Sequence, residues 1–222
     1  MIWVYGICER PELPAPSGRG LAQAPLDGVR EGELLAVVSR HISPPSDPAR
    51  DALWAHERVV ERIMADRAVL PMRFGSKLAD DDALREVLAA RQQEFLATLD
   101  RVRGRVEVSV RAMQPLGAPR SPPVTTSGRE YLEAKLRNGR EVATLDEPLA
   151  SLAVEVSRQR SRAPEELLRA SYLIEEAVLE RFRGTVERLQ RTHPAVAILC
   201  TGPWPPYSFV TTSVTLTAPV AR

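Results

Sequence analysis

The sequence of 222 residues has few of the side chains on which enzymes and metal centres depend. It holds two cysteines and three histidines, and they lie far apart along the chain. Two thiols without histidine neighbours do not make a zinc site, which takes four ligands. The sequence also lacks the Gly-x-Ser-x-Gly motif of hydrolases and the glycine-rich Walker phosphate loop. We therefore predict no catalytic, cofactor-binding or metal-binding residue.

Long apolar runs and an excess of one charge are missing as well. The longest apolar runs, such as Ala195–Cys200, are far shorter than the roughly 20 residues that span a bilayer. Met1 leads into apolar residues without a basic stretch, so no signal peptide is expected. The formal net charge of +1 favours neither nucleic acid nor an anionic membrane as a partner. These features predict a cytoplasmic protein in which Cys8 and Cys200 stay reduced as core thiols.

The first half alternates between β-rich runs and amphipathic helical runs. The predicted strands are Ile2–Cys8, Glu33–Ile42, Ala68–Phe74 and Arg105–Val110. Asp47 and Pro48 are expected to start one helix, and Asp80–Asp82 precede another, which Gly104 ends. The order β-β-α-β-α-β, with helices on one face of a small sheet, predicts an α+β fold of the modified ferredoxin-like sandwich type.

The two helical runs have apolar positions at spacings of three and four. On the first they are Leu53, His56, Val60, Ile63 and Met64. On the second they are Leu84, Val87, Leu88, Phe95, Leu96, Leu99 and Val102. His56 is accordingly interpreted as a core histidine rather than a catalytic one. Asp80–Asp82 are interpreted as helix-capping residues, because the helix N-terminus favours negative charge.

A proline-rich stretch, Gln114–Ser127, divides the chain in two. The predicted divisions are an N-terminal ferredoxin-like domain at 1–113, a linker at 114–127, a helix-rich α+β domain at 128–210 and a tail at 211–222. The second half opens with Ser127 and Glu130 in capping-box spacing, and a further helical segment restarts at Asp146.

The end of the second half is harder to assign. By propensity, Pro164–His193 forms a single long helix, but its part Leu167–Ile174 fits a strand equally well. Ala195–Cys200 is predicted to be a strand.

The segment Thr201–Phe209 reads Thr-Gly-Pro-Trp-Pro-Pro-Tyr-Ser-Phe and is the most unusual part of the chain. Its three prolines fix φ and remove backbone donors, and its three aromatic residues provide large apolar area. These residues are Pro203, Trp204, Pro205, Pro206, Tyr207 and Phe209. The segment either pins the C-terminus against the second domain or presents a surface to a partner. Because the prolines stiffen it and a strand precedes it, we favour the structural role.

This nonapeptide resembles the most distinctive motif of the GvpF/GvpL family of gas vesicle proteins. Further segments agree with the family in the same order along the chain: Tyr5–Ile7, Leu35–Ser39, Val69–Gly75, Gly128–Leu132 and Ala170–Ile174. The resemblance covers nearly the whole chain. It adds Arg73 and Phe74 to the six motif residues as positions with a structural or partner-binding role.

The resemblance implies a fold and a function. It implies two α+β domains, the first a modified ferredoxin-like one, with a strand around Tyr172. It implies a non-enzymatic accessory or minor structural protein, located in the gas vesicle and the cytoplasm. Such a protein is expected to bind the hydrophobic shell protein GvpA and other gas vesicle proteins, and to limit aggregation during vesicle nucleation. The chain departs from the family after Tyr131, where Asn138-Gly139 and Pro148 interrupt a helix that is long in many members.

Two other functions stay open on the sequence alone. One is a metal-dependent hydrolase that uses Asp80–Asp82, and the other is a ligand-binding regulator on a ferredoxin-like scaffold. The absence of a histidine and carboxylate constellation argues against the hydrolase. A fold by itself does not imply a function, so the regulator has little support.

Overall fold

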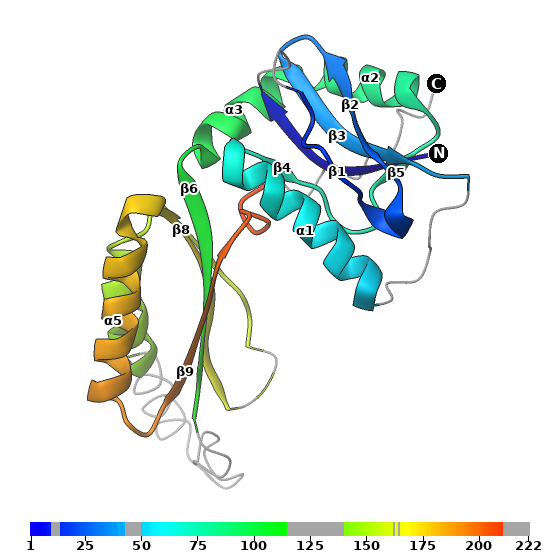
Figure 1. Ribbon diagram of the computed structural model, residues 1–222. Coiled ribbons are helices and arrows are strands. Elements are labelled where there is room, and N and C mark those ends of the chain that lie inside the picture. The colour runs from blue at the N-terminus through cyan, green and yellow to red at the C-terminus, as the bar shows by residue number, and fades with distance from the viewer. Residues whose placement is uncertain (10–13, 43–49, 115–139, 162, 164, 211–222) are drawn as a thin grey trace, which may run out of the picture. The chain divides into compact units, whose positions relative to one another are not determined.

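The computed structural model describes residues 1–9, 14–42, 50–114, 140–161, 163 and 165–210. These residues form two compact units, each built around its own antiparallel sheet (Figure 1). The first unit contains Met1–Gly104 together with the chain after Trp204, and the second contains Arg105–Trp204. The α+β class predicted from the sequence is confirmed, whereas the ferredoxin-like detail stays a prediction.

The first sheet is centred on β1 (Ile2–Glu9), whose side chains are nearly all buried. The strand order is β2 (Leu26–Glu31), β3 (Leu34–Arg40), β1 and β4 (Leu70–Pro71), and β5 (Lys77–Leu78) also pairs with β1. A short 3-10 helix, η1 (Leu21–Gln23), precedes β2. A strand buried along its whole length needs cover on both faces of its sheet.

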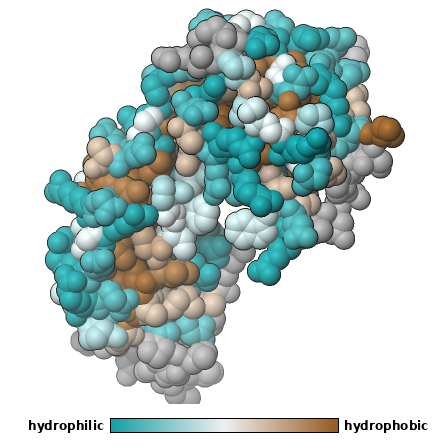
Figure 2. All heavy atoms as spheres, in the orientation of Figure 1, coloured by the Kyte–Doolittle hydropathy of each residue, from teal (hydrophilic) through white to brown (hydrophobic). Residues whose placement is uncertain are grey.

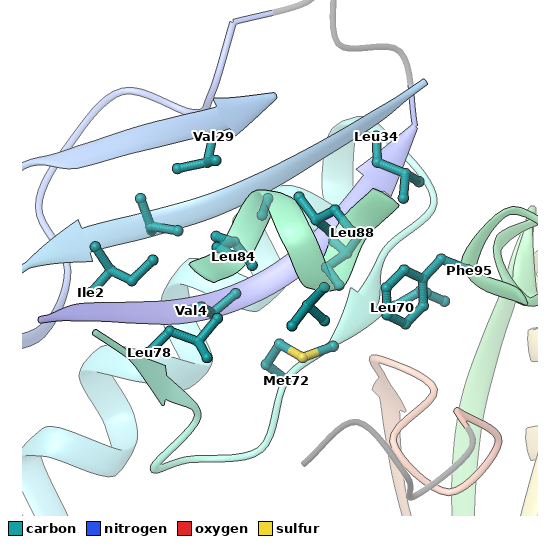
Figure 3. Packing of buried hydrophobic residues seen from close by; sticks show 14 of the residues in the cluster. Ile2, Val4, Val29, Leu34, Leu70, Met72, Leu78, Leu84, Leu88 and Phe95 are labelled. Carbon is teal, nitrogen blue, oxygen red and sulfur yellow. The ribbon is translucent and has the colours of Figure 1, made fainter. Parts of the chain in front are cut away.

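Helices cover both faces of this sheet, not one face as predicted. On one face, α1 (Arg50–Asp66) contributes Val59, Val60 and Ile63 to a cluster with Trp3 and Tyr5. On the other, α2 (Asp81–Ala90) and α3 (Gln92–Val102) pack against Ile2, Val4 and their neighbours (Figure 3). Successive residues of β1 point to opposite faces, so both sets are buried by one strand. The sequence shows that Ile2–Cys8 carries no charged residue, but not how many layers cover the strand.

Several boundaries in the first unit differ from the predictions. The predicted strand Glu33–Ile42 contains β3 but misses β2, which precedes it and pairs with it. The predicted strand Ala68–Phe74 shrinks to the two residues of β4. Leu53 is 41% exposed and lies off the buried face of α1. The helix over 81–102 is divided at Arg91, whose φ of −120° is not helical. The predicted start of α1 at Asp47 lies outside the described residues.

The second sheet has the order β7 (Glu155–Arg158), β8 (Glu166–Glu175), β6 (Arg105–Met113) and β9 (Ala197–Trp204). A helix over residues 140–150 and α5 (Leu179–Thr192), which follows the short η2 (Glu176–Val178), complete the unit (Figure 1). The core joins alternate residues of β6 and β8 to Leu145, Leu149, Phe182, Val186 and Leu189.

The strand β6 pairs with β8 and β9, although the order of elements predicted it in the first sheet. Its alternating valines predict a half-buried strand correctly, but alternation carries no information about which sheet the strand joins. The compact units therefore divide at Gly104 and Trp204 instead of following the predicted limits of 1–113 and 128–210. Apart from Gln114, the linker 114–127 lies outside the described residues, as do Ser127, Glu130 and the tail 211–222. The linker and the tail stay predictions.

The ambiguous run before α5 is resolved in favour of a strand. Leu167–Ile174 lies within β8, as the family resemblance implied, and the helix is limited to α5. The 140–150 helix continues through Asp146 and Pro148, where a restart was predicted. The chain after this helix forms β7 at Glu155–Arg158.

Candidate functional site in the C-terminal segment

The C-terminal segment 201–210 changes environment halfway along. Residues Thr201–Trp204 end the edge strand β9, whereas the chain from Pro205 belongs to the first unit. The backbone N–H of Tyr207 donates to the Pro205 carbonyl at 2.7 Å. The backbone N–H of Val210 donates to the Pro206 carbonyl at 3.1 Å. These bonds fold residues 205–210 into a compact turn. Its buried residues are Pro205, Pro206, Phe209 and Val210.

Tyr207 fixes this turn to α1. Its hydroxyl donates a hydrogen bond to Glu57 Oε2 at 2.9 Å, and its ring packs on the cluster that contains Trp3 and Val60. Burial, and then the charge of Glu57, raise the pKa of Tyr207, so the phenol stays a donor. Burial also raises the pKa of Glu57, while the bond from Tyr207 lowers it. The pair links residues 150 positions apart in the sequence.

The end of the turn joins the other core of the first unit. Val210 is buried with Ile2, Val4 and Phe95. The Arg101 guanidinium at the end of α3 donates to the Phe209 carbonyl. Residues 205–210 therefore pack on the first unit, which corrects the expectation that the segment pins the C-terminus against the second domain. The prediction rested on position in the sequence, which placed the segment after the second set of elements.

Trp204 is only half-buried, in contrast to the residues that follow it. Its indole Nε1 donates to Thr201 Oγ1 at 3.2 Å, and its backbone lies opposite Glu107 of β6. Gly202 has a φ of +124°, and a Cβ there would lie 2.7 Å from the Glu107 carbonyl oxygen. Only glycine fits this position. Pro203 follows a cis peptide bond and is exposed.

Arg73 and Phe74 follow β4 and have different surroundings. Arg73 is exposed, whereas Phe74 is half-buried with its ring edge-on to Trp3, the ring centroids 4.8 Å apart. Phe74 and Tyr207 border the same core cluster. The structure thus brings these two motif residues to one cluster, while Arg73 is not part of it. Their structural or partner-binding role stays a prediction.

His56 is a satisfied core residue, as predicted. Trp3 Nε1 donates to His56 Nδ1 at 2.9 Å, so the neutral ring carries its proton on Nε2. That proton is donated to the Met72 carbonyl at 2.7 Å. Burial lowers the pKa of His56 to about 4, although the bond to Met72 raises it in part. Both ring nitrogens are engaged, so His56 offers no free atom for chemistry.

In the acidic run at the start of α2, Asp80 caps the helix, as predicted. Asp80 Oδ1 accepts a hydrogen bond from Ala83 N–H at 2.9 Å. Asp81 pairs with Arg40 at 2.6 Å, and Asp82 with Arg85 at 2.7 Å. Across the described ranges, no group of three or more His, Cys, Asp or Glu could hold a metal ion.

Arg103 and Arg158 also have structural partners. Arg103 binds Glu9, and Arg158 pairs with Asp146 at 2.6 Å. Asp146 in turn accepts the hydroxyl proton of Tyr172 at 2.6 Å. This link between the 140–150 helix, β7 and β8 was missed, because nothing in the spacing of the three residues indicates it.

Both cysteines are free thiols. Cys8 is buried and donates to the Leu35 carbonyl at 3.3 Å, and burial raises its pKa to about 11. Cys200 is half-buried, and burial raises its pKa as well. Neither thiol ionises readily near neutral pH. Among the described helices, none is long and apolar enough to cross a membrane.

Known proteins resemble the chain along nearly its whole length. Residues 1–120 and 128–211 match the family described as gas vesicle synthesis protein GvpL/GvpF. Gas vesicle protein F of Streptomyces sp. (strain CB03234) is 31% identical, covering 94% of this chain and 98% of the relative. Gas vesicle protein L of the same strain is 27% identical, covering 93% and 91%. The crystal structure of GvpF from Anabaena sp. PCC7120 superimposes with a TM-score of 0.80 at 20% identity, covering 96% of this chain and 98% of that one.

Proposed function

Because the chain belongs to the GvpL/GvpF family of gas vesicle synthesis proteins, we propose that it binds the shell protein GvpA and keeps it from aggregating during vesicle nucleation. Family membership supports a role in gas vesicle assembly. The single observation that carries the proposal is the family match, which leaves out only 121–127 and the last residues. The residues 121–127 fall within the predicted linker.

The proposed activity follows from the chemistry of such a shell. A very apolar subunit aggregates in water unless its apolar surface is covered before it joins the growing wall. A protein with an accessible sheet edge or apolar groove covers such a surface by binding. Binding of this kind is stoichiometric and needs no ATP. The lack of a phosphate-loop motif in the sequence agrees with this.

A non-enzymatic role is part of the proposal. The relatives are named as gas vesicle proteins, not as enzymes. Two residues considered as catalytic or metal-binding candidates have structural partners. His56 forms hydrogen bonds through both ring nitrogens, and Asp80 caps α2. We further propose that other gas vesicle proteins are partners, and that the protein occurs in the cytoplasm and at the gas vesicle.

Co-expression with GvpA tests the function. The protein should raise the soluble fraction of GvpA in proportion to its own amount, and GvpA should be recovered with it in a pull-down. Adding apyrase to remove ATP should leave the recovered amount unchanged. Expression of GvpA without the protein is the control. Failure to recover GvpA at both low and moderate salt would refute the proposal.

A further inference from the structure

The strand β9 is a sheet edge without charged side chains. Its sequence is Ala-Ile-Leu-Cys-Thr-Gly-Pro-Trp, and it lies at one end of the strand order of the second sheet. The opposite edge, β7, carries Glu155 and Arg158, and the edge strand β2 of the first sheet carries Asp27, Arg30 and Glu31. Charged side chains ordinarily prevent a sheet edge from pairing with another chain. On β9 this protection is missing.

Some backbone groups of β9 point away from the sheet. Ile198 N–H donates to the Gln190 side chain at 2.8 Å, so it faces the outer edge and not β6. In an antiparallel pair, alternate residues of an edge strand direct their N–H and C=O outward. The backbone N–H and C=O of Cys200 therefore face outward, as the N–H of Ile198 does. The backbone groups of Leu199 and Thr201 instead face β6, where their register partners are Arg111 and Ser109.

Side chains of α5 occupy the two ends of this edge. Gln190 bonds to both Val196 O and Ile198 N, and Arg183 donates to the Gly202 carbonyl at 3.3 Å. Between them lie Ile198 C=O and both backbone groups of Cys200. Within the part of the chain that the structure describes, no partner is found for the outward groups of Cys200. A short stretch of edge is thus left open.

The open stretch lies beside an exposed apolar side chain. Leu199 is 55% exposed, and it points to the face opposite Ile198 and Cys200, which border the core under α5. Figure 2 shows hydrophobic residues among hydrophilic ones on the visible surface of the unit that carries α5. Free backbone groups next to an exposed leucine fit an extended apolar segment, whereas a charged segment would find no counter-ion on β9.

We propose that the outer edge of β9 at Ile198–Cys200 binds an extended, uncharged apolar segment of the gas vesicle shell protein by strand addition. The open backbone groups require an extended partner, and the uncharged edge requires an uncharged one. The inference rests on the proposed function, which supplies a very apolar partner. It adds where that partner docks and in which conformation.

A pair of matched variants tests the edge. Leu199→Glu places a charge on β9 at a side chain that is 55% exposed, so the variant should fold. Val154→Glu makes the same kind of change at an equally exposed position, 51% exposed, beside the other edge strand. In pull-downs, Leu199→Glu should recover about tenfold less GvpA, equivalent to a loss of roughly 1.4 kcal/mol, and Val154→Glu should recover as much as the unmodified protein.

Hydrogen exchange of the unmodified protein gives an independent test that needs no variant. The Cys200 amide should exchange more slowly when GvpA is bound, while the amides of β7 should not change. Retained GvpA binding by Leu199→Glu, or an equal loss in both variants, would overturn the edge site and leave the proposed function standing. If the unmodified protein does not bind GvpA, the proposed function itself fails. A dimer that Leu199→Glu dissociates, with GvpA binding unchanged, would assign the edge to a second copy of this chain.

Discussion

The two halves of the segment 201–210 share a composition but not an environment. Thr201–Trp204 lie at a sheet edge, half-buried or exposed, whereas Pro205–Val210 form a turn in the cores of the first unit. Prolines and aromatic residues occur in both halves. The comparison teaches that composition alone does not decide between a structural and a binding role. Neighbouring elements decide it, and here they favour a structural role for 205–210, whereas the edge at 198–200 is the proposed binding site.

The largest effect is expected from truncating the buried half. Phe209 is only 3% exposed, so Phe209→Ala removes a buried ring and should lower the free energy of unfolding by about 3–5 kcal/mol. Urea denaturation measures this change. A loss below about 1 kcal/mol would show that residues 205–210 do not hold the first unit together, because a typical domain is stabilised by roughly 5–15 kcal/mol.

A pH titration probes the core on which Tyr207 packs. The native pKa of His56 is lowered to about 4 from 6.5, so its neutral form is favoured by folding. This stability is fully present above about pH 6.5 and is lost as the pH falls toward 4. The loss should reach about 3 kcal/mol at pH 4. His56→Gln should show a smaller decrease between pH 7 and 4. If parent and variant lose stability in parallel, the prediction is wrong.

The bond from Tyr207 to Glu57 should have an intermediate effect. Tyr207→Phe keeps the ring but removes the donor from a half-buried carboxyl, which should cost about 2 kcal/mol. Glu57→Gln with Tyr207→Phe completes a double-mutant cycle. The coupling free energy should be about 1 kcal/mol or more, and additive effects would contradict a direct interaction.

The exposed half should tolerate change better. Trp204 is half-buried and bonds only locally to Thr201, so Trp204→Ala should cost about 1–2 kcal/mol, less than Phe209→Ala. Thermal denaturation of both variants in one buffer gives the comparison. If Trp204→Ala unfolds at the lower temperature, the division between a buried and an exposed half fails.

Cleavage in the linker should have the smallest effect on stability. The composition of 114–127 predicts that limited trypsin cuts first at Arg120. The nicked protein should keep a melting temperature close to that of the intact chain. First cleavage between Arg85 and Arg101, within α2 and α3, would contradict the predicted linker.

Local structure was largely predictable from this sequence, and long-range pairing was not. The strands β1 and β3, the helix α5 and the cap at Asp80 follow from periodicity and capping chemistry, which depend on nearby residues. The membership of β6 in the second sheet depends on its partners, β8 and β9, more than 50 residues away. The break at Arg91 also escaped prediction, because the apolar spacing continues across it.

In the candidate site too, local features were predictable and long-range contacts were not. The nonapeptide could be recognised from its sequence, but the unit on which its second half packs was predicted wrongly. Its docking on α1 through Tyr207 and Glu57 joins positions 150 residues apart, which no local pattern reveals. The open edge at Cys200 depends on which backbone groups of β9 face outward and on which of them the Gln190 side chain bonds. Neither can be predicted from the sequence.

The assembly of the first unit from both ends of the sequence has a consequence for biosynthesis. Val210 and Tyr207 belong to its two cores, yet the ribosome makes them after the whole of the second unit. Domains ordinarily fold in the order in which they emerge, the N-terminal one first. Here the first 104 residues emerge without the residues that complete their cores. A nascent chain halted before residue 205 should therefore carry a first unit that is open to proteases until synthesis resumes.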